Sequence, residues 1–415
     1  MVTPGLADAW AALAAERPDR DAVVAGPDRR TYAELVRRAH ALGRWLRARG
    51  VAPGDRVALV LPGRVEHFEA LAGALSVGIV AVTVDGRARA DEVHRVVDAT
   101  DAKVVVHDAG TARTVTRALK PIQRQWRPTT LETGGSYEDA VTAFVAEDHA
   151  DLGPPSGVVL VGPAAGSSAT VARLDTDALV RAARASEAVD GPHLVLAPLS
   201  FGTGLVGSLT TLSAGGTVIL PPDARWNAHD MLDVVAREHV RHVTLDGDAQ
   251  ARPLRDALCA QPGRWDTSSL RTITSTDAPL SGDVCDDLAR AIPGIAVERT
   301  TTRVDDANAP PPRDVIATAA GMVDPARIEA RVMTHRGVTA CRVIGLADRT
   351  GAGVAVALVV VADDHYLDAA ELQAWSRPKL AAHEMPRAWL FVDALDTTAT
   401  DADLRTVALA HLRST

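Results

Sequence analysis

Aromatic residues are scarce in this sequence of 415 residues, because Trp, Tyr and Phe together make up only 3% of it. Cysteine is rarer still. Cys259, Cys285 and Cys341 lie far apart, with the spacing of neither a zinc site nor a disulfide framework. The thirteen histidines show no metal-ligand spacing. We therefore expect no metal and no bound cofactor.

Two further absences exclude classes of partner. The net charge is -9, from 44 basic and 53 acidic residues, and this gives no electrostatic footprint for nucleic acid or an anionic membrane. No apolar run reaches the length of a membrane span, and the amino terminus lacks a basic stretch followed by an apolar core. We expect a cytoplasmic protein that binds neither nucleic acid nor membrane.

Short apolar runs alternate with helical patterns along the first hundred residues. Residues 31–48 carry apolar side chains at helical spacing, and the run RVALVL at 56–61 is typical of a buried strand. The same alternation returns after residue 158. It predicts parallel sheets flanked by helices. Residues 109–155 contain several glycines and prolines, and we predict a loop-rich connection there.

The proline-rich stretch NAPPP at 308–312 is the clearest linker, because consecutive prolines disfavour both helix and central strand. About a hundred residues follow it, which is the size of a small domain. We divide the chain into a large domain at 1–307, a linker at 308–313 and a small domain at 314–415.

Several segments together resemble one family. Residues 30–60 (RTYAELVRRAHALGRWLRARGVAPGDRVALV) are similar to the opening of acyl-CoA ligases, non-ribosomal peptide adenylation domains and luciferases. The similarity continues in the same order through 196–220, 268–281 and 313–345. The resemblance to this adenylate-forming superfamily implies an α/β fold. It comprises a large N-terminal domain of two doubly wound α/β halves and a small α+β C-terminal domain, with the active site between them.

The segments that would handle ATP depart from the family pattern. The family's phosphate loop, YTSGTTGxPKG, corresponds to VGPAAGSSATV at 161–171, where Thr170 replaces the lysine. Gly166, Ser167 and Ser168 would remain as a degenerate phosphate loop. The alternative interpretation is a plain surface turn. The family's GYGxTE turn corresponds to 298–304, which has no aromatic residue and no correctly placed acid.

Two more departures concern the C-terminal half. Only 305–312 separates the degenerate turn from the small domain, so we predict that the family's intervening β-rich subdomain is deleted, with its ribose-binding aspartate. Ala402 stands at the position of the family's catalytic lysine, after Asp401 in place of a glycine. An acid there would repel a phosphate. These departures predict a pseudoenzyme that cannot adenylate with ATP.

The resemblance also assigns an acyl pocket. Phe201 corresponds to the family's gate histidine, and Thr276 and Asp277 to a glycine pair. The expected pocket residues are Phe201, Gly202, Thr203, Gly204, Thr276, Thr300, Thr301 and Thr302. Asp246, Asp277 and Arg303 are the candidate catalytic residues, because a desolvated carboxylate at a strand end can act as a general base. The alternative is that these are solvated loop residues.

Three functions remain open from the sequence. The first is a binding protein in a natural-product pathway that recognises an acyl or aryl molecule or thioester, a polyketide-like intermediate, a biosynthetic enzyme or a carrier protein. The second is a repurposed enzyme that performs cyclisation, isomerisation or acyl transfer without ATP. The third is a weak acyl-CoA ligase. The first is the main expectation because the scaffold is retained while the ATP-handling residues are lost.

Overall fold

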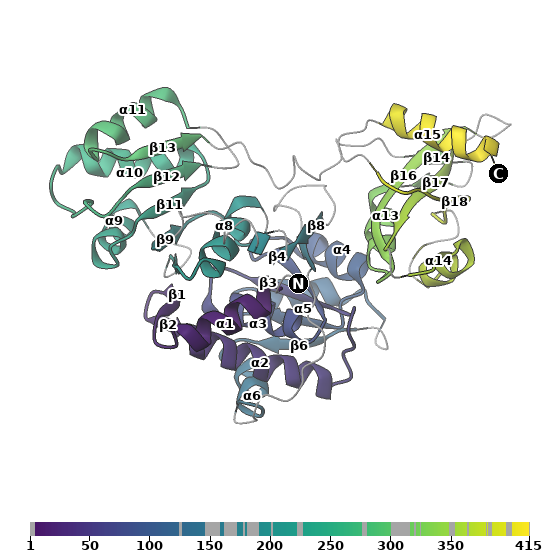
Figure 1. Cartoon of the computed structure of the whole chain (residues 1–415), viewed down its shortest axis with the longest axis horizontal. Coiled ribbons are helices and arrows are strands. Elements are labelled where there is room, and N and C mark those ends of the chain that lie inside the picture. Colours follow the sequence, from purple (N-terminus) through teal and green to yellow (C-terminus); the bar gives the residue numbers. More distant parts are fainter. Residues whose placement is uncertain are drawn as a thin grey trace.

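The computed structural model contains three β-sheets with flanking helices (Figure 1). It describes residues 5–123, 127–145, 158–161, 172–176, 179–180, 191–200, 202–221, 227–275, 280–299, 316–318, 321–323, 325–347, 353–362, 365–378, 380, 384–395 and 401–414. Two of the sheets are mainly parallel, as the alternating pattern predicted. Within the described residues, no helix is both long and apolar enough to cross a membrane.

The six-stranded sheet has the order β6-β5-β3-β4-β7-β8, and all neighbours are parallel except β7 and β8. All six residues of β3, in the middle of the sheet, are buried, which is why residues 57–61 form a continuous apolar run. The strands are β3 (Arg56–Leu61), β4 (Val80–Asp85), β5 (Val104–His107), β6 (Thr129–Glu132), β7 (Val158–Val161) and β8 (Ala172–Asp175). The helices associated with it are α2 (Tyr32–Ala48), α3 (Val65–Ser76), α4 (Ala90–Thr100), α5 (Ala112–Leu119) and α6 (Ser136–Thr142).

The prediction of a loop-rich connection at 109–155 is wrong. The described part of this segment contains α5, β6 and α6. Helix α5 buries Val115, Ala118 and Leu119 on one face, at helical spacing. Strand β6 extends the sheet at its edge beside β5. Gly134 has a positive φ, which glycine adopts readily, in the tight turn between β6 and α6.

The seven-stranded sheet has the order β13-β12-β11-β9-β10-β1-β2, with only β2 antiparallel to its neighbour. Strands β1 and β2, at one end of this sheet, come from the start of the chain. They join the sheet through β10, where Val23 of β1 pairs with Val218. The strands are β1 (Asp21–Ala25), β2 (Asp28–Thr31), β9 (Pro192–Val195), β10 (Thr217–Leu220), β11 (His242–Leu245), β12 (Thr272–Ser275) and β13 (Ala296–Arg299). The helices are α8 (Gly202–Ser213), α9 (Ala228–Arg237), α10 (Asp248–Ala260) and α11 (Gly282–Ala291).

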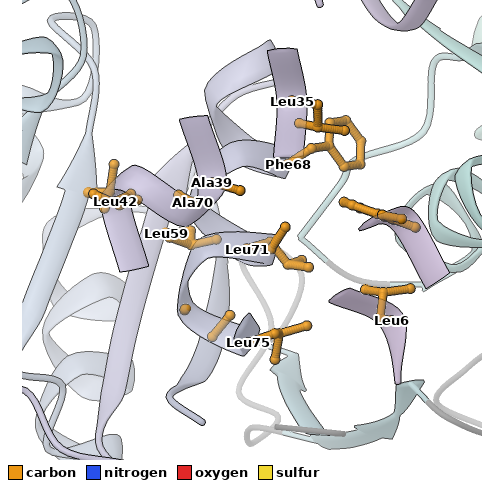
Figure 2. Close-up of a cluster of buried hydrophobic side chains, with 14 of the residues drawn as sticks. Leu6, Leu35, Ala39, Leu42, Leu59, Phe68, Ala70, Leu71 and Leu75 are labelled. Carbon is orange, nitrogen blue, oxygen red and sulfur yellow. The ribbon is translucent and has the colours of Figure 1, made fainter. Parts of the chain in front are cut away.

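The two sheets share one apolar core, around α1 (Leu6–Glu16), α2 and α3 (Figure 2). Figure 2 shows Leu6 of α1 together with Leu71 and Leu75 of α3. Helices α2 and α3 pack closely because glycines lie at their contact. A Cβ atom on Gly73 would lie only 2.6 Å from the Ala39 carbonyl oxygen, so even alanine does not fit there.

The C-terminal unit forms a separate sheet in which β16 and β17 are antiparallel and β18 pairs with β17 in parallel. Its strands are β14 (Ile316–Thr318), β15 (Gly321–Val323), β16 (Val338–Ala347), β17 (Gly353–Val361) and β18 (Ala388–Phe391). Its helices are α13 (Pro325–Met333), α14 (Ala369–Ser376) and α15 (Asp401–Ser414). The predicted linker at 308–313 lies outside the described residues, so the domain division stays a prediction.

Two buried histidines should make the fold sensitive to acid. Burial lowers the pKa of His67 to about 4, and burial, with His242 nearby, lowers the pKa of His193 to about 3. Both rings are therefore neutral in the folded protein at pH 7. Their neutral state contributes stability that is fully present above the unfolded pKa of about 6.5 and is lost as the pH falls toward the folded values.

We expect the free energy of unfolding to fall by about 1.4 kcal/mol per histidine for each pH unit below 6.5. His67→Phe should remove roughly half of this pH dependence, because it removes one of the two buried histidines. The replacement breaks no hydrogen bond, since neither ring nitrogen of His67 has a partner among the described residues. Urea denaturation midpoints at pH 7.5, 6.5 and 5.5 measure the effect. An unchanged pH slope in the variant would mean that His67 ionises freely in the folded state.

Candidate functional site

The carboxyl ends of the parallel strands carry the candidate polar groups of the seven-stranded sheet. Asp246 directly follows β11, and its side chain is half-buried. Its backbone N–H donates to Gln250 Oε1 at 2.8 Å, and Gln250 Nε2 donates to the Leu196 carbonyl at 3.3 Å. The next residue, Gly247, donates to Ser275 Oγ at 3.1 Å. The turn that holds Asp246 is thus tied to both neighbouring strands.

The six-stranded sheet presents a fixed cation at its own carboxyl edge. Arg87 follows β4, and its guanidinium contacts both carboxylate oxygens of Asp85, at 3.3 Å from Nε and 3.2 Å from Nη2. The Asp85 side chain is 4% exposed, whereas that of Arg87 is 67% exposed. The hydrogen bond to Asp85 raises the pKa of Arg87, and the charge of Asp246 contributes in the same direction. The negative charge of Asp246, on the other sheet, therefore acts favourably on the positive charge of Arg87.

A direct hydrogen bond joins the two sheet edges. Thr83 Oγ1 of β4 donates to the carbonyl of Ser200, beyond β9, at 2.5 Å, and both residues are buried. Ser200 is 3% exposed, and its buried hydroxyl has no hydrogen-bond partner among the described residues. The carboxyl ends of β4 and β9 are held together there. In open α/β folds, ligands bind in the crevice outside the carboxyl ends of strands.

Helix α8 begins at this edge with three of the predicted pocket residues, Gly202, Thr203 and Gly204. A Cβ atom on Gly204 would lie 2.2 Å from the Pro198 carbonyl oxygen and 2.8 Å from that of Ala197. Only glycine lets the helix approach the strand end so closely. Gly204 therefore serves close packing of the helix at this edge.

Most of the other predicted site residues lie outside the described part of the chain. These are Gly166, Ser167, Ser168, Thr170, Phe201, Thr276, Asp277, Thr300, Thr301, Thr302 and Arg303. The strands before Thr276 and Thr300 are parallel to β11, so both strands end at the edge that carries Asp246. The convergence of Asp246, Asp277 and Arg303 stays a prediction.

Three placements refine the sequence interpretation. Glu298 and Arg299 belong to β13, where they pair with Thr274 and Ser275, so the strand runs two residues into the segment predicted as a turn. Asp248 begins α10 and its Oδ1 accepts from the backbone N–H of Ser281 at 2.9 Å. Ala402 lies in the first turn of α15.

Within the described residues, no group of three or more His, Cys, Asp or Glu side chains is arranged to hold a metal ion.

Comparison with known proteins identifies the family. Residues 10–300 match the family model described as AMP-binding enzyme, and residues 327–401 match that of the AMP-binding enzyme C-terminal domain. The chain belongs to the AMP-binding enzyme family. The predicted membership of the adenylate-forming superfamily is confirmed, and so is the α/β fold with a C-terminal domain.

Two relatives of this AMP-binding family member match over most of its length. A feruloyl-CoA synthase from Amycolatopsis sp is 27% identical over 485 residues, covering 94% of this chain and 95% of the relative. A medium-chain acyl-CoA ligase, Mig, from Mycobacterium avium is 25% identical over 330 residues, covering 69% of this chain and 60% of the relative. The first alignment is longer than this chain, so that relative has segments which the chain lacks. Where they fall, and thus the predicted deletion after residue 304, stays a prediction.

Solved structures share the fold. The anthranilate CoA ligase AuaEII has a TM-score of 0.61 at 15% identity, covering 100% of this chain and 98% of that one. A Mycobacterium tuberculosis fatty acyl CoA synthetase has a TM-score of 0.60 at 19% identity, with 97% of each chain covered.

The main functional expectation, a pseudoenzyme that cannot adenylate with ATP, is wrong. The relatives that match over most of the chain are CoA synthases and CoA ligases, and this similarity favours a working ligase. The residue changes at the positions of Thr170 and Ala402 therefore do not place the chain outside the ligases. The expectation erred because it judged function from individual motif positions, whereas the similarity extends along the scaffold.

Proposed function

We propose that this protein is an acyl-CoA ligase that activates an acyl or aryl carboxylic acid with ATP and transfers it to coenzyme A. The observation that carries the proposal is the similarity of 94% of the chain to a feruloyl-CoA synthase. The geometry supports it, since the carboxyl edges of two parallel sheets meet at the bond between Thr83 and Ser200. We propose the substrate and nucleotide site at this meeting edge.

Each group at this edge has a role that its chemistry suits. Arg87, fixed by the buried Asp85, supplies a positive charge that faces developing negative charge on phosphate or carboxylate oxygens. The small polar loop at Gly166, Ser167 and Ser168 is proposed to donate backbone N–H groups to phosphate. Asp246, on the opposite sheet, is proposed to face the acyl substrate.

The residue changes bear on the rate of the proposed reaction. Removing one preorganised group that stabilises transition-state charge lowers kcat by about 10² to 10³. Thr170 and Ala402 stand where the family has two such cations, so we expect slow turnover rather than none. We therefore expect this protein to catalyse the same type of reaction as the family, with a lower kcat.

The test is formation of a thioester by the purified full-length protein, followed by mass spectrometry. Reactions contain ATP, magnesium and coenzyme A with ferulic, anthranilic, octanoic or palmitic acid, and each component is omitted in turn. The proposal requires a CoA thioester that depends on ATP. Absence of both thioester and acid-dependent ATP–pyrophosphate exchange for every acid would overturn it. Replacing coenzyme A with a phosphopantetheinylated carrier protein tests whether the carrier protein expected as a partner can accept the acyl group.

The bond between the sheet edges gives a matched pair of variants. Thr83→Val keeps the side-chain shape but leaves the buried Ser200 carbonyl without its donor, which costs about 1–3 kcal/mol. We expect thioester formation to fall about tenfold as the two edges lose register. The control is Thr116→Val, which removes a Thr-to-carbonyl bond of 2.8 Å on the exposed side of α5. Equal activity in the two variants would show that this bond does not position the edges.

A further inference from the structure

Helix α5 carries a basic surface to which the proposed function gives no role. Residues 109–131 contain five basic residues and no acidic one, although acidic residues outnumber basic ones by 53 to 44 in the whole chain. Arg113, Arg117 and Lys120 of this segment are exposed. None of the three forms an ion pair with an acidic side chain of the described residues. Their charges are therefore available to a partner.

These three cations form a row along one side of the helix. At about 100° per residue, their side chains leave the helix axis within roughly 60° of one another. The buried residues of α5, which are Val115, Ala118 and Leu119, lie on the opposite side and belong to the core shared with α4. From Arg113 to Lys120 the row is about 10 Å long. It faces solvent over its whole length.

The stability of the helix does not account for this row. A cation stabilises a helix near its carboxyl end and destabilises it near its amino end, where the helix dipole is positive. Arg113 is the second residue of α5. Elsewhere, exposed arginines such as Arg252 and Arg290 pair with an acid about one turn away in their own helix, at 2.8 and 2.7 Å. In α5 such acids are absent, so the positive charges of the row are not compensated.

The row begins at the carboxyl edge of the six-stranded sheet. Strand β5 is parallel to β3, and β3 is parallel to β4. Helix α5 follows β5, so it starts at the edge that carries Asp85 and Arg87. Arg113 therefore lies at the edge of the proposed substrate and nucleotide site, and Lys120 lies about 10 Å further toward the amino edge. A protein docked along α5 can present a reactive group to that site.

Three kinds of macromolecule could supply the negative charge. Nucleic acid is disfavoured because the whole protein carries a net charge of -9. An anionic membrane is disfavoured because the exposed side of α5 adds Thr116 to the cations and offers no apolar side chain for insertion. An acidic protein helix fits best, because carboxylates three or four residues apart on one helix face match the spacing of the row.

We propose that Arg113, Arg117 and Lys120 form a docking surface for an acidic carrier protein whose phosphopantetheine thiol accepts the acyl group. In that step the sulfur bonds to the acyl carbon of the acyl-adenylate, the bond from this carbon to the AMP oxygen breaks, and the thiol proton passes to solvent. The identity of the partner as an acyl acceptor rests on the proposed function. The charge complementarity of the surface does not depend on it.

Two charge-reversal variants of the full-length protein test the docking surface. Arg113→Glu combined with Arg117→Glu reverses two charges of the row. The control is Arg37→Glu combined with Arg47→Glu in α2, where both arginines are exposed. Helices α2 and α5 belong to different cores, on opposite faces of β3. Each replacement changes the charge by the same amount, so the two variants have equal net charge and differ only in where it changes.

Binding is measured by fluorescence anisotropy with labelled, phosphopantetheinylated carrier proteins of the fatty-acid, polyketide and peptide types, at about 0.05 and 0.2 M sodium chloride. The parent protein should bind at least one of them. The α5 variant should bind it about tenfold or more weakly and with less dependence on salt, whereas the α2 variant should match the parent. The KM for coenzyme A should be the same in all three proteins.

Failure of the parent to bind any of the three carriers, or equal losses in the two variants, would overturn the docking surface. So would tighter binding of a DNA duplex or of phosphatidylglycerol vesicles than of any carrier. A raised KM for coenzyme A with unchanged carrier binding in the α5 variant would assign the row to the phosphates of coenzyme A instead. Carrier binding without thioester formation on either acceptor would contradict the proposed function and leave the docking surface standing.

Discussion

Changing Asp401 to glycine and Ala402 to lysine in one variant should raise the rate of adenylate formation by about 10². The stretch DTTATDAD at 396–403 would then read DTTATGKD, which restores the family pattern TxTGK. The lysine supplies a cation for the developing charge on the phosphate. The glycine removes a carboxylate that repels it.

The gain should appear in kcat more than in KM, because the new charge acts mainly on the transition state. Acid-dependent ATP–pyrophosphate exchange measures it directly. The control carries Asp401→Gly with Ala402→Gln, which adds a long polar side chain without charge and should gain at most a few-fold. If the glutamine and lysine variants show equal rates, residue 402 does not reach the nucleotide and the alignment of this stretch is wrong.

Replacing Glu69 with alanine should lower the free energy of unfolding by about 3–5 kcal/mol. The Glu69 side chain is fully buried, and its Oε1 accepts from Arg30 Nε and Arg38 Nε at 2.7 Å each. Its Oε2 accepts from the Tyr137 hydroxyl at 3.1 Å. Burial alone would lower the pKa of Arg38, but the bond to Glu69 holds it above its usual value. Without Glu69, two arginines lose a buried partner.

Urea denaturation at pH 7 measures this change. Glu69→Gln, which keeps the shape and most of the hydrogen bonds, should lie between the parent protein and the alanine variant. Glu138→Ala is the control, because Glu138 also pairs with Arg38, at 2.9 Å, but is 38% exposed. An exposed partner contributes about 1 kcal/mol or less. A loss for Glu69→Ala as small as that for Glu138→Ala would mean that solvent replaces the buried carboxylate.

Much of the strand pattern could be read directly from the sequence. The bounds predicted for 56–61 are those of β3. This run is largely apolar because all six residues of the strand are buried. The edge strand β6 was missed because only Leu131 of its four residues is buried. The hairpin of β1 and β2 was missed because its partner β10 lies almost two hundred residues away.

Prediction of the site was limited because residues far apart in the sequence contribute to it. The sequence placed Asp246 and the start of α8 at strand ends, and the structure has them there. Nothing in the sequence singled out Arg87, because its importance depends on the buried Asp85 beneath it and on Asp246 from another sheet.

By itself, the sequence determined the family, the alternation of strands and helices, and the strand ends at which the candidate groups stand. Apolar periodicity is a local property, and it is written into each segment before any contact forms. The tertiary structure alone decided which edges meet. Thr83 and Ser200 are 117 positions apart, and helices α4 and α13, which come from distant parts of the chain, pack against each other. Such pairings follow from how whole sheets and helices pack, which no single segment specifies.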